Sequence, residues 1–298
     1  MEIKRILAGV KHPLEGNAFI QSVIQIAVLQ GATHVTFLYV TDSLPDINFP
    51  AVEGKSSYES LMLAFQNRVQ TFAEKAAGIA LSYEIREGAK DEMLLQWAKS
   101  SNADLVILGR RSGKLGSNSR SIKVARLAPC HVLLIPETHV WKPVRRVLIP
   151  MDFSPYANIG LQVAKNIPQL QDAILLHVYD VPSGYYYTGL SETEAEARML
   201  KNARDSYEQF MKSNDIGNLS PVPAFLLNKS GTVAETILDY ARNQKAEMMI
   251  VGSKGLTGAI GFMLGSVSQD LIRNQDEIPV LIVKRKDEKL SLLDALIA

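Results

Sequence analysis

The sequence predicts an α/β protein made of two tandem, doubly wound domains, each an open five-stranded parallel sheet flanked by helices. Short apolar runs rich in β-favouring residues alternate with stretches whose apolar residues recur at helical spacing. Such alternation predicts parallel strands joined by right-handed crossovers. The first half of the chain also resembles the second, at an offset of about 140 residues. Each half is therefore expected to be one domain.

Five strands or strand–helix units are shared by the two halves. In chain order, the matched segments are 5–10 with 146–151, 37–42 with 175–180, 88–98 with 231–241, 103–109 with 246–252, and 131–135 with 279–283. Between the copies, Pro136 and Pro143 mark the expected linker. The predicted domains are therefore 1–139 and 140–286, and a tail of 287–298 lies outside the repeat.

Helices are predicted between the strands from their apolar spacing. The expected helices include 17–30 and 58–77 in the first copy, and 157–166 and 192–212 in the second. The last of these begins with a capping box, Ser191 to Glu194. Before it stand Tyr185, Tyr186 and Tyr187, which either cover a bound base as a lid or pack on their own domain's surface.

The composition limits the classes of function. The 298 residues carry 32 basic and 31 acidic side chains, so a net charge of +1 gives no general electrostatic reason for binding nucleic acid or an anionic membrane. A single cysteine, Cys130, excludes an internal disulfide and a cysteine-rich zinc site. No apolar run reaches the roughly 18 residues of a membrane-spanning helix, and the N-terminus does not resemble a signal peptide. We expect a cytoplasmic protein.

The most informative stretch is 252–268, between an apolar strand and a helical pattern. Gly252, Gly255 and Gly265 are expected to take positive φ and to let a ligand approach the backbone. Ser266 and Ser268 open the helix, whose N-terminal N–H groups attract anions. A Walker A loop is excluded because no Lys precedes the Ser after Gly265. A dinucleotide fingerprint would lie at the first strand of a domain. The stretch predicts a phosphate-binding loop of another kind.

This loop resembles the nucleotide-binding loop of the universal stress protein family. The resemblance extends to the segments 147–154 and 175–178, in the same order. It implies a Rossmann-like fold of the adenine nucleotide alpha hydrolase-like type and the binding of ATP, or of ADP or AMP, in the second domain, with Mg²⁺ helping to neutralise the phosphates. Family members act mostly in stress-linked regulation.

The resemblance also assigns roles to residues of the second copy. The family places Asp152 beside the adenosine, where its carboxylate accepts from ribose hydroxyls or helps to hold a metal ion, and the backbone of Val178 pairs with the adenine edge. The full set of expected binding residues is Pro150, Asp152, Val178, Gly252, Ser253, Gly255, Gly265, Ser266, Val267 and Ser268. From the residues alone, segment 152–155 is equally well explained as a turn and a helix cap.

The first copy departs from this pattern. Lys11 replaces Asp152, and the Gly-Ser-Lys-Gly that begins the loop becomes Gly109-Arg110-Arg111-Ser112. Nucleotide binding is therefore not expected in the first domain. The same region holds six cations and no acid, at Arg110, Arg111, Lys114, Arg120, Lys123 and Arg126. A solvated basic loop is the first interpretation, and binding of an anion or acidic partner is the second.

Other chemistry has little support in the sequence. The five histidines have no metal-ligand spacing, and His177 is expected to be a core residue. The nucleophile elbow Gly-x-Ser-x-Gly is absent. No catalytic residue is predicted. The expected function is a regulatory protein that binds an adenine nucleotide, and the alternatives are a slow Mg²⁺-dependent nucleotide hydrolase and a scaffold that works without nucleotide.

The sequence also predicts how the chain assembles. The last strand of each copy, 132–135 and 280–283, is an apolar run expected at a sheet edge, so the two halves should pair as an intramolecular pseudo-dimer. In the tail, Leu293, Leu296 and Ile297 share one helical face. We expect this face to dock on a second chain, as part of a homodimer contact.

Overall fold

A computed structural model gives the structure of the chain. It describes residues 2–14, 16–44, 47, 49–110, 119–229, 231–255, 264–274 and 277–285. The chain folds as two compact units, Glu2–Pro143 and Val144–Val283. The expected tail helix and two of the six cations of the basic region, Arg111 and Lys114, lie outside the described residues.

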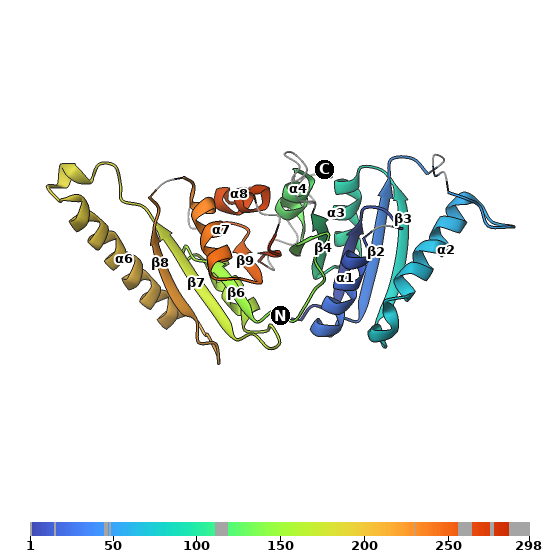
Figure 1. The fold of residues 1–298 in the computed structure, drawn as a ribbon, viewed down its shortest axis with the longest axis horizontal. Coiled ribbons are helices and arrows are strands. Elements are labelled where there is room, and N and C mark those ends of the chain that lie inside the picture. The colour runs from blue at the N-terminus through green and yellow to red at the C-terminus, as the bar shows by residue number, and fades with distance from the viewer. Residues whose placement is uncertain are drawn as a thin grey trace. The chain divides into compact units, whose positions relative to one another are not determined.

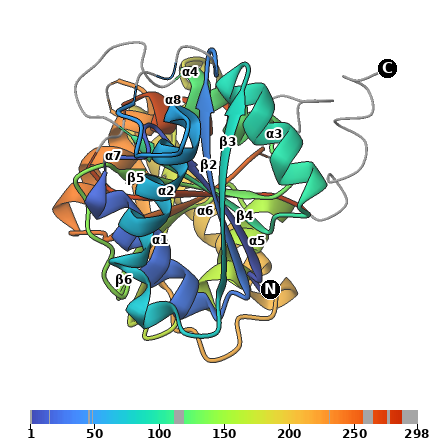
Figure 2. The ribbon, with the colours of Figure 1, turned by 90° about the vertical axis from the view of Figure 1, so that its right-hand side faces the viewer.

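The first unit alternates strands and helices, as predicted. Its elements are β1 (Arg5–Val10), α1 (Asn17–Gln30), β2 (His34–Thr41), α2 (Ser57–Gln70), a 3-10 helix (Ala73–Ala76), β3 (Ala80–Glu87), α3 (Lys90–Ser100), β4 (Leu105–Arg110), α4 (Ser119–Leu127) and β5 (His131–Pro136). The strands pair in parallel in the order β3-β2-β1-β4-β5, with Leu7 of β1 between Thr36 of β2 and Val106 of β4. Helices α1 and α2 lie on one side of β2 and β3 and α3 lies on the other (Figure 2). Both faces are covered, which explains the continuous apolar runs of β1 and β4.

The second unit repeats this plan. Its elements are β6 (Arg146–Pro150), α5 (Pro155–Ala164), β7 (Asp172–Tyr179), a 3-10 helix (Tyr185–Thr188), α6 (Glu192–Ser213), β8 (Val222–Leu227), α7 (Val233–Asn243), β9 (Met248–Gly252), α8 (Ser266–Asn274) and β10 (Val280–Val283). The parallel order is β10-β9-β6-β7-β8. Figure 1 shows α6 on one side of β7 and β8, with α7 on the other and α8 beside it. The fold class predicted from the sequence is confirmed.

The crossover from β8 to β9 reverses direction along the second sheet. From β6 the chain moves through β7 to β8, and it then returns past β6 to β9 and β10. Strands β6 and β9 are therefore neighbours whose following connections leave toward opposite faces of the sheet. In open α/β sheets a crevice forms at the carboxyl ends of two such strands, and ligands bind there.

Helix starts follow their sequence signals closely. Ser191 accepts a hydrogen bond from the backbone N–H of Glu194, and the Glu194 carboxylate accepts from the Ser191 backbone, so the predicted capping box is confirmed. The same reciprocal pair begins α7, between Thr232 and Glu235. Each box satisfies N–H groups that the first turn of a helix leaves without intrahelical partners.

Two helix boundaries differ from the expectation. Helix α2 ends at Gln70 and not at residue 77, and a separate 3-10 turn, Ala73–Ala76, follows it. Helix α5 begins at Pro155, two residues before the predicted start. Ser154 is its N-cap, accepting from the N–H of Ala157 at 3.2 Å, and a proline suits the first position.

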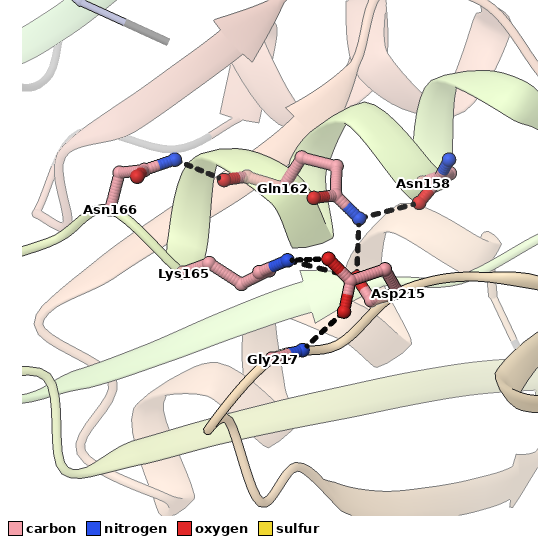
Figure 3. A network of polar contacts seen from close by, with 6 residues as sticks. All are labelled: Asn158, Gln162, Lys165, Asn166, Asp215 and Gly217. Atoms are coloured by element: carbon pink, nitrogen blue, oxygen red, sulfur yellow. Dashed lines mark hydrogen bonds and ion pairs between the residues drawn. The ribbon is translucent and has the colours of Figure 1, made fainter.

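A polar network fixes the connection between α6 and β8 to the end of α5 (Figure 3). Lys165 contacts the Asp215 carboxylate at 2.6 Å, and the amide of Gln162 donates to the Asp215 carbonyl at 2.7 Å. The second carboxylate oxygen of Asp215 accepts from the N–H of Gly217 at 2.9 Å. Gly217 has a φ of 54°, and a Cβ there would lie 2.9 Å from Cε of Lys165. The turn therefore requires glycine for its backbone conformation, and a Cβ there would in addition make the end of the flexible Lys165 side chain shift.

This network should make stability depend on pH. The hydrogen bond from Lys165 lowers the pKa of the Asp215 carboxyl below its ordinary value of 3.8. A depressed pKa contributes stability above the unfolded value that is lost as the pH falls through the folded one. We expect Asp215→Asn to lower the melting temperature slightly at neutral pH. The difference from the unaltered protein should begin to shrink as the pH falls below 3.8 and should be lost as the pH passes through the lowered pKa of Asp215, as checked by thermal unfolding across that range. An equal difference at all pH values would contradict this.

None of the helices in the described part of the chain is long and apolar enough to cross a membrane.

Candidate functional site

A cavity of about 320 Å³ lies at the carboxyl ends of the strands of the second unit. Strands β6, β7 and β9 contribute its floor through Pro150, Leu176 to Val178, and Val251 with Gly252. Helices α5, α7 and α8 contribute the remaining walls. The full lining is Pro150, Met151, Asp152, Ala157, Leu176, His177, Val178, Val233, Ile237, Val251, Gly252, Lys254, Gly255, Gly265, Ser266, Val267 and Ser268. This volume is in the range of small-molecule sites.

The structure brings nine of the ten predicted binding residues to this one cavity. The exception is Ser253, which is buried and does not line it. Its backbone N–H donates to Val283 at 3.1 Å, and its carbonyl accepts from the N–H of Gly265 at 2.9 Å. Ser253 therefore anchors the phosphate-loop candidate to β10 and to the start of α8, which is a positioning role.

Asp152 lies two residues beyond the end of β6, in a tight turn. Its Oδ1 accepts from the N–H of Ser154 at 3.0 Å, and Phe153 between them has a φ of 61°. A phenylalanine in the left-handed region is uncommon and costs free energy. The turn and helix cap expected as the alternative explanation are present, and the Asp152 side chain lines the cavity as well. The two interpretations of segment 152–155 are therefore compatible.

The loop glycines do not have the backbone conformation that the sequence suggested. None of Gly252, Gly255 and Gly265 has a positive φ, so that expectation is wrong. Two of them are required by space instead. A Cβ at Gly252 would lie 2.8 Å from Cβ of Tyr156, and one at Gly255 would lie 2.7 Å from Oδ2 of Asp152. At the third glycine, Gly265, an added Cβ would make only ordinary contacts of 3.5 Å or more.

The first turn of α8 lies at the cavity, with its backbone N–H groups before the helical ladder. The Gly265 carbonyl accepts the first hydrogen bond of the helix, from Gln269, so the N–H groups of Ser266, Val267 and Ser268 precede the helical ladder. The Ser268 hydroxyl donates to the carbonyl of Gly252 at 2.7 Å. It therefore ties α8 to β9, whereas the sequence suggested a donor to phosphate. Backbone N–H groups at the positive end of a helix are the groups that bind anions in other proteins.

His177 is a wall residue that the sequence analysis assigned to the core. It is half-buried in β7 and lines the cavity. Its Nδ1 lies 2.7 Å from the carbonyl oxygen of Met151, and its ring lies 4.7 Å from the ring of Phe153. A carbonyl can only accept, so Nδ1 carries the proton in this contact. The contacts of His177 with Met151 and Phe153 hold the Asp152 turn against β7. The order of residues along the sequence does not indicate these contacts.

The other lining residues missed from the sequence lie on strand ends, on helices and in the loop; those at strand ends are Met151, Leu176 and Val251. Val233 and Ile237 are one turn apart on α7 and add an apolar wall. Ala157 is the third residue of α5, and Lys254 lies between two glycines that were predicted. The helical spacing of residues 233 and 237 could have indicated a shared face, but only the tertiary structure shows which face adjoins the strand ends.

The corresponding place in the first unit is almost filled. Only about 50 Å³ remains, lined by Gly9, Val10, Lys11, Gly16, Phe19, Gly109 and Glu137. Lys11, which replaces Asp152, forms an ion pair with Glu137. Phe19 is the third residue of α1, as Ala157 is of α5, and its ring packs on Gly109, whose added Cβ would be 3.2 Å away. A large side chain and an ion pair thus occupy the space that is open in the second unit.

The basic region of the first unit is only partly solvated. Arg110 is the last residue of β4 and is buried, which contradicts its assignment to an exposed loop. Lys123 contacts the Asp91 carboxylate of α3 at 2.6 Å, and this contact raises the pKa of Lys123 and lowers that of Asp91. The acids that pair with Lys123, Asp91 and Glu92, come from the neighbouring helix α3, and for that reason the local sequence showed none.

The three consecutive tyrosines form the 3-10 helix after β7. Tyr186 and Tyr187 are 58% and 82% exposed, and their ring centroids are 4.3 Å apart. None of the three lines the cavity. They therefore form no lid over the cavity in this structure, and the contact of their 3-10 helix with α6 agrees with packing on the surface of their own domain. Cys130, by contrast, is buried as expected.

The described residues do not form a protein-built metal site. Among them, no cluster of three or more His, Cys, Asp or Glu side chains could hold a metal ion. Within this part of the chain, Asp152 is the only carboxylate that lines the cavity. The expected Mg²⁺ would therefore find one carboxylate of the described protein, and that same carboxylate is the expected ribose acceptor.

Comparison with known proteins identifies the family of both halves. Residues 2–136 and 143–284 each match the universal stress protein family. The chain belongs to this family. It carries the domain twice, which agrees with the internal repeat and with the two similar sheets.

Relatives of single-domain length align with about half of this tandem chain. A universal stress protein of Methanocaldococcus jannaschii is 29% identical over 161 residues, which cover 48% of this chain and 96% of that protein. A universal stress protein of Thermus aquaticus is 34% identical over 146 residues, which cover 47% of this chain and 98% of that protein.

Solved structures match the chain over nearly its whole length. A putative universal stress protein of Pseudomonas aeruginosa has a TM-score of 0.64 at 16% identity, covering 99% of this chain and 98% of its own. A universal stress protein of Archaeoglobus fulgidus has a TM-score of 0.62 at 18% identity, and the match covers 96% of this chain and 100% of that protein. At these identities the likeness concerns the fold.

Proposed function

We propose that the second domain of this tandem universal stress protein binds an adenine nucleotide, ATP, ADP or AMP, and that the protein regulates a stress response through it. The observation that carries the proposal is the 320 Å³ cavity, which gathers a carboxylate, a strand-end backbone and a helix N-terminus at the carboxyl edge of one sheet. These are three recognition groups for the three parts of a nucleotide.

Each part of the nucleotide has a suitable wall. The backbone near Val178 and the apolar side chains of Val233 and Ile237 would take the flat base, and Asp152 would accept hydrogen bonds from ribose hydroxyls. Phosphates would lie at Ser266 and Val267, where helix α8 begins. The loop glycines allow the backbone at 252 and 255 to come close without a side chain between.

The direct test is the identity of any small molecule that copurifies. We expect mass spectrometry of the gently purified chain to release an intact adenine nucleotide. A protein that carries none, and that binds none when titrated, would contradict the proposal and favour a scaffold. Release of inorganic phosphate from added ATP, dependent on Mg²⁺ and on Asp152, would instead favour the slow hydrolase.

Asp152→Ala should weaken nucleotide binding about tenfold or more, because a hydrogen bond to a charged acceptor is worth roughly 1.5–3 kcal/mol. Calorimetric titration would measure this. Asp180→Ala is the matched control. Asp180 follows β7 and accepts from Asn228 at 3.0 Å, but it does not line the cavity, so its removal should leave the affinity unchanged. Equal effects of the two substitutions would remove Asp152 from the site.

We further propose an intramolecular pseudo-dimer of the two domains and a homodimer contact through the tail. The support is the apolar sequence of β5 and β10, each last in the strand order of its own unit, and the helical spacing of Leu293 and Leu296. Small-angle scattering of the full chain should then fit one compact particle, and deletion of residues 288–298 should lower the mass found by light scattering. Independently moving halves, or an unchanged mass, would contradict the respective proposal.

A further inference from the structure

A separate cavity, of about 230 Å³, lies at the amino ends of the strands of the first unit. Strands β1 and β2 and the segment that joins α3 to β4 supply its walls. The lining residues are Arg5, Ile6, His34, Thr36, Ser101 and Ala103. All of them belong to the first unit, so this cavity shares no residue with the proposed nucleotide site.

The second unit shows an arginine at the corresponding place with its partner present. Arg146 of β6 corresponds to Arg5 of β1 in the internal repeat, and it pairs in register with Asp172, the first residue of β7. Its Nε and Nη2 donate to Oδ2 of Asp172 at 2.9 and 2.7 Å. Its Nη1 donates to the carbonyl of Gln244, at the end of α7, at 3.0 Å. One guanidinium thus binds a carboxylate and a helix end together.

In the first unit the arginine is held in the same way but lacks the carboxylate. Nη1 of Arg5 donates to the carbonyl of Ser101, at the end of α3, at 3.0 Å. Arg5 pairs in register with His34, which replaces the acid of the second unit. Among the described residues, no carboxylate forms an ion pair with Arg5. The donors that Asp172 accepts from in the second unit are therefore available at the cavity of the first.

A nearby acid, Asp104, does not take the place of this partner. Its Oδ2 accepts from the backbone N–H groups of Lys4 and Arg5, at 3.0 Å each. Glu247 makes the same two backbone contacts in the second unit, where the arginine binds a further carboxylate as well. An acid at this position is therefore compatible with a second carboxylate at the guanidinium.

We propose that the cavity of the first unit binds a small organic molecule through a carboxylate, which Arg5 receives as Arg146 receives Asp172. A guanidinium matches the geometry of a carboxylate, and the hydroxyl groups of Thr36 and Ser101 in the lining suit a polar ligand. A volume of about 230 Å³ is below the roughly 300 Å³ at which drug-sized sites begin, so the ligand has few heavy atoms. This site goes beyond nucleotide binding, because it lies in the other unit.

The test is a titration of the full-length chain with succinate, followed by NMR through the backbone amide signals of Ile6 and Thr36, which every variant retains. We expect the signals to shift and to saturate, and we expect succinamide, the uncharged analogue, to leave them in place. Arg5→Gln should weaken succinate binding about fivefold, the worth of an exposed ion pair. Lys4→Gln removes a neighbouring charge that does not line the cavity, so it should leave the affinity unchanged.

Position 34 offers a matched pair of variants. His34→Asp gives the first unit the acid of the second, so the new carboxylate should bind Arg5 and abolish succinate binding without lowering the melting temperature. His34→Asn has nearly the same shape as His34→Asp but no charge, and it should still bind succinate.

Four results would overturn the proposal. They are succinate shifts that do not saturate, equal binding by the two variants at position 34, an effect of Arg5→Gln no larger than that of Lys4→Gln, and tighter binding of inorganic phosphate than of succinate. None of these measurements involves a nucleotide, so their outcome is independent of the function proposed for the second domain.

Discussion

Gly265→Val is expected to abolish nucleotide binding while leaving the folded protein intact. A Cβ at position 265 would meet Ser268 Oγ at 3.5 Å and the loop backbone at 3.7 Å, which are ordinary contacts. The backbone there does not have the positive φ that would strain a β-branched residue. The two γ-methyl groups would instead extend into the cavity at the start of α8, where the phosphates are proposed to lie. Binding should fall below detection, and the melting temperature should change by only a few degrees.

Gly265→Ala provides the graded control. One methyl group fits the contacts above and removes less of the phosphate space, so this variant should bind more weakly than the unaltered protein and more tightly than Gly265→Val. Calorimetry gives the affinities and thermal unfolding gives the stability of each. If Gly265→Val bound nucleotide normally, the phosphates would have to lie elsewhere. If it unfolded while Gly265→Ala did not, the glycine would be required for folding, contrary to the observed contacts.

The architecture was predictable because it depends on patterns that are local or repeated. Continuous apolar strands and apolar residues at helical spacing are patterns of burial, and the internal repeat shows that the same pattern occurs twice. Together they predict the two five-stranded parallel sheets. Cap signals also act over a few residues, and the capping box at Ser191 was confirmed. The end of α2 was predicted at residue 77, whereas the helix ends at Gln70 and a 3-10 turn, Ala73–Ala76, follows.

The site was predictable to the extent that it lies on strand ends and one loop. Gly252, Gly255 and Gly265 were identified as a group, but the reason assigned to them was wrong. The spacing of the glycines shows where side chains are missing. It does not show whether the backbone conformation or a lack of space requires glycine there. For Gly255 the cause is the Asp152 carboxylate, 103 positions earlier in the chain, at 2.7 Å from the position of a Cβ. Such long-range contacts also explain why His177 was assigned to the core.

The sequence predicts that the first domain binds no nucleotide, and the small cavity found there adds a second reason for that prediction. The argument from the sequence was that Lys11, a cation, replaces the carboxylate of Asp152. The structure adds that Lys11 forms an ion pair with Glu137, so neither charge is without a partner. Phe19 had been counted among the apolar residues of a helix, which is true, but its ring also fills the space over Gly109. Helical periodicity assigns a residue to the buried face and does not show which element that face adjoins.

Ala157→Phe should abolish nucleotide binding in the second domain, because it transfers the side chain that fills the first. Residues 157 and 19 are both third in the helix that follows the first strand of their units. Ala157 lines the open cavity, whereas Phe19 packs beside Gly109 in the small one. An added ring should occupy the space over Gly252 and exclude the ligand, at a cost of about 1–3 kcal/mol of stability from overpacking. Calorimetry should then show the stoichiometry fall from one nucleotide per chain to none.

The converse substitution, Phe19→Ala, tests whether this one side chain accounts for the expected difference in nucleotide binding between the two domains. Phe19→Ala enlarges the cavity of the first domain but leaves Lys11 paired with Glu137, so no ribose acceptor appears and the stoichiometry should remain one per chain. The lost ring should lower stability by about 3–5 kcal/mol, as for other buried aromatic residues. Two nucleotides bound per chain, in either the unaltered protein or Phe19→Ala, would show that the ion pair is no barrier. Unchanged binding by Ala157→Phe, with a normal melting curve, would place the ligand away from α5 and outside the cavity described above.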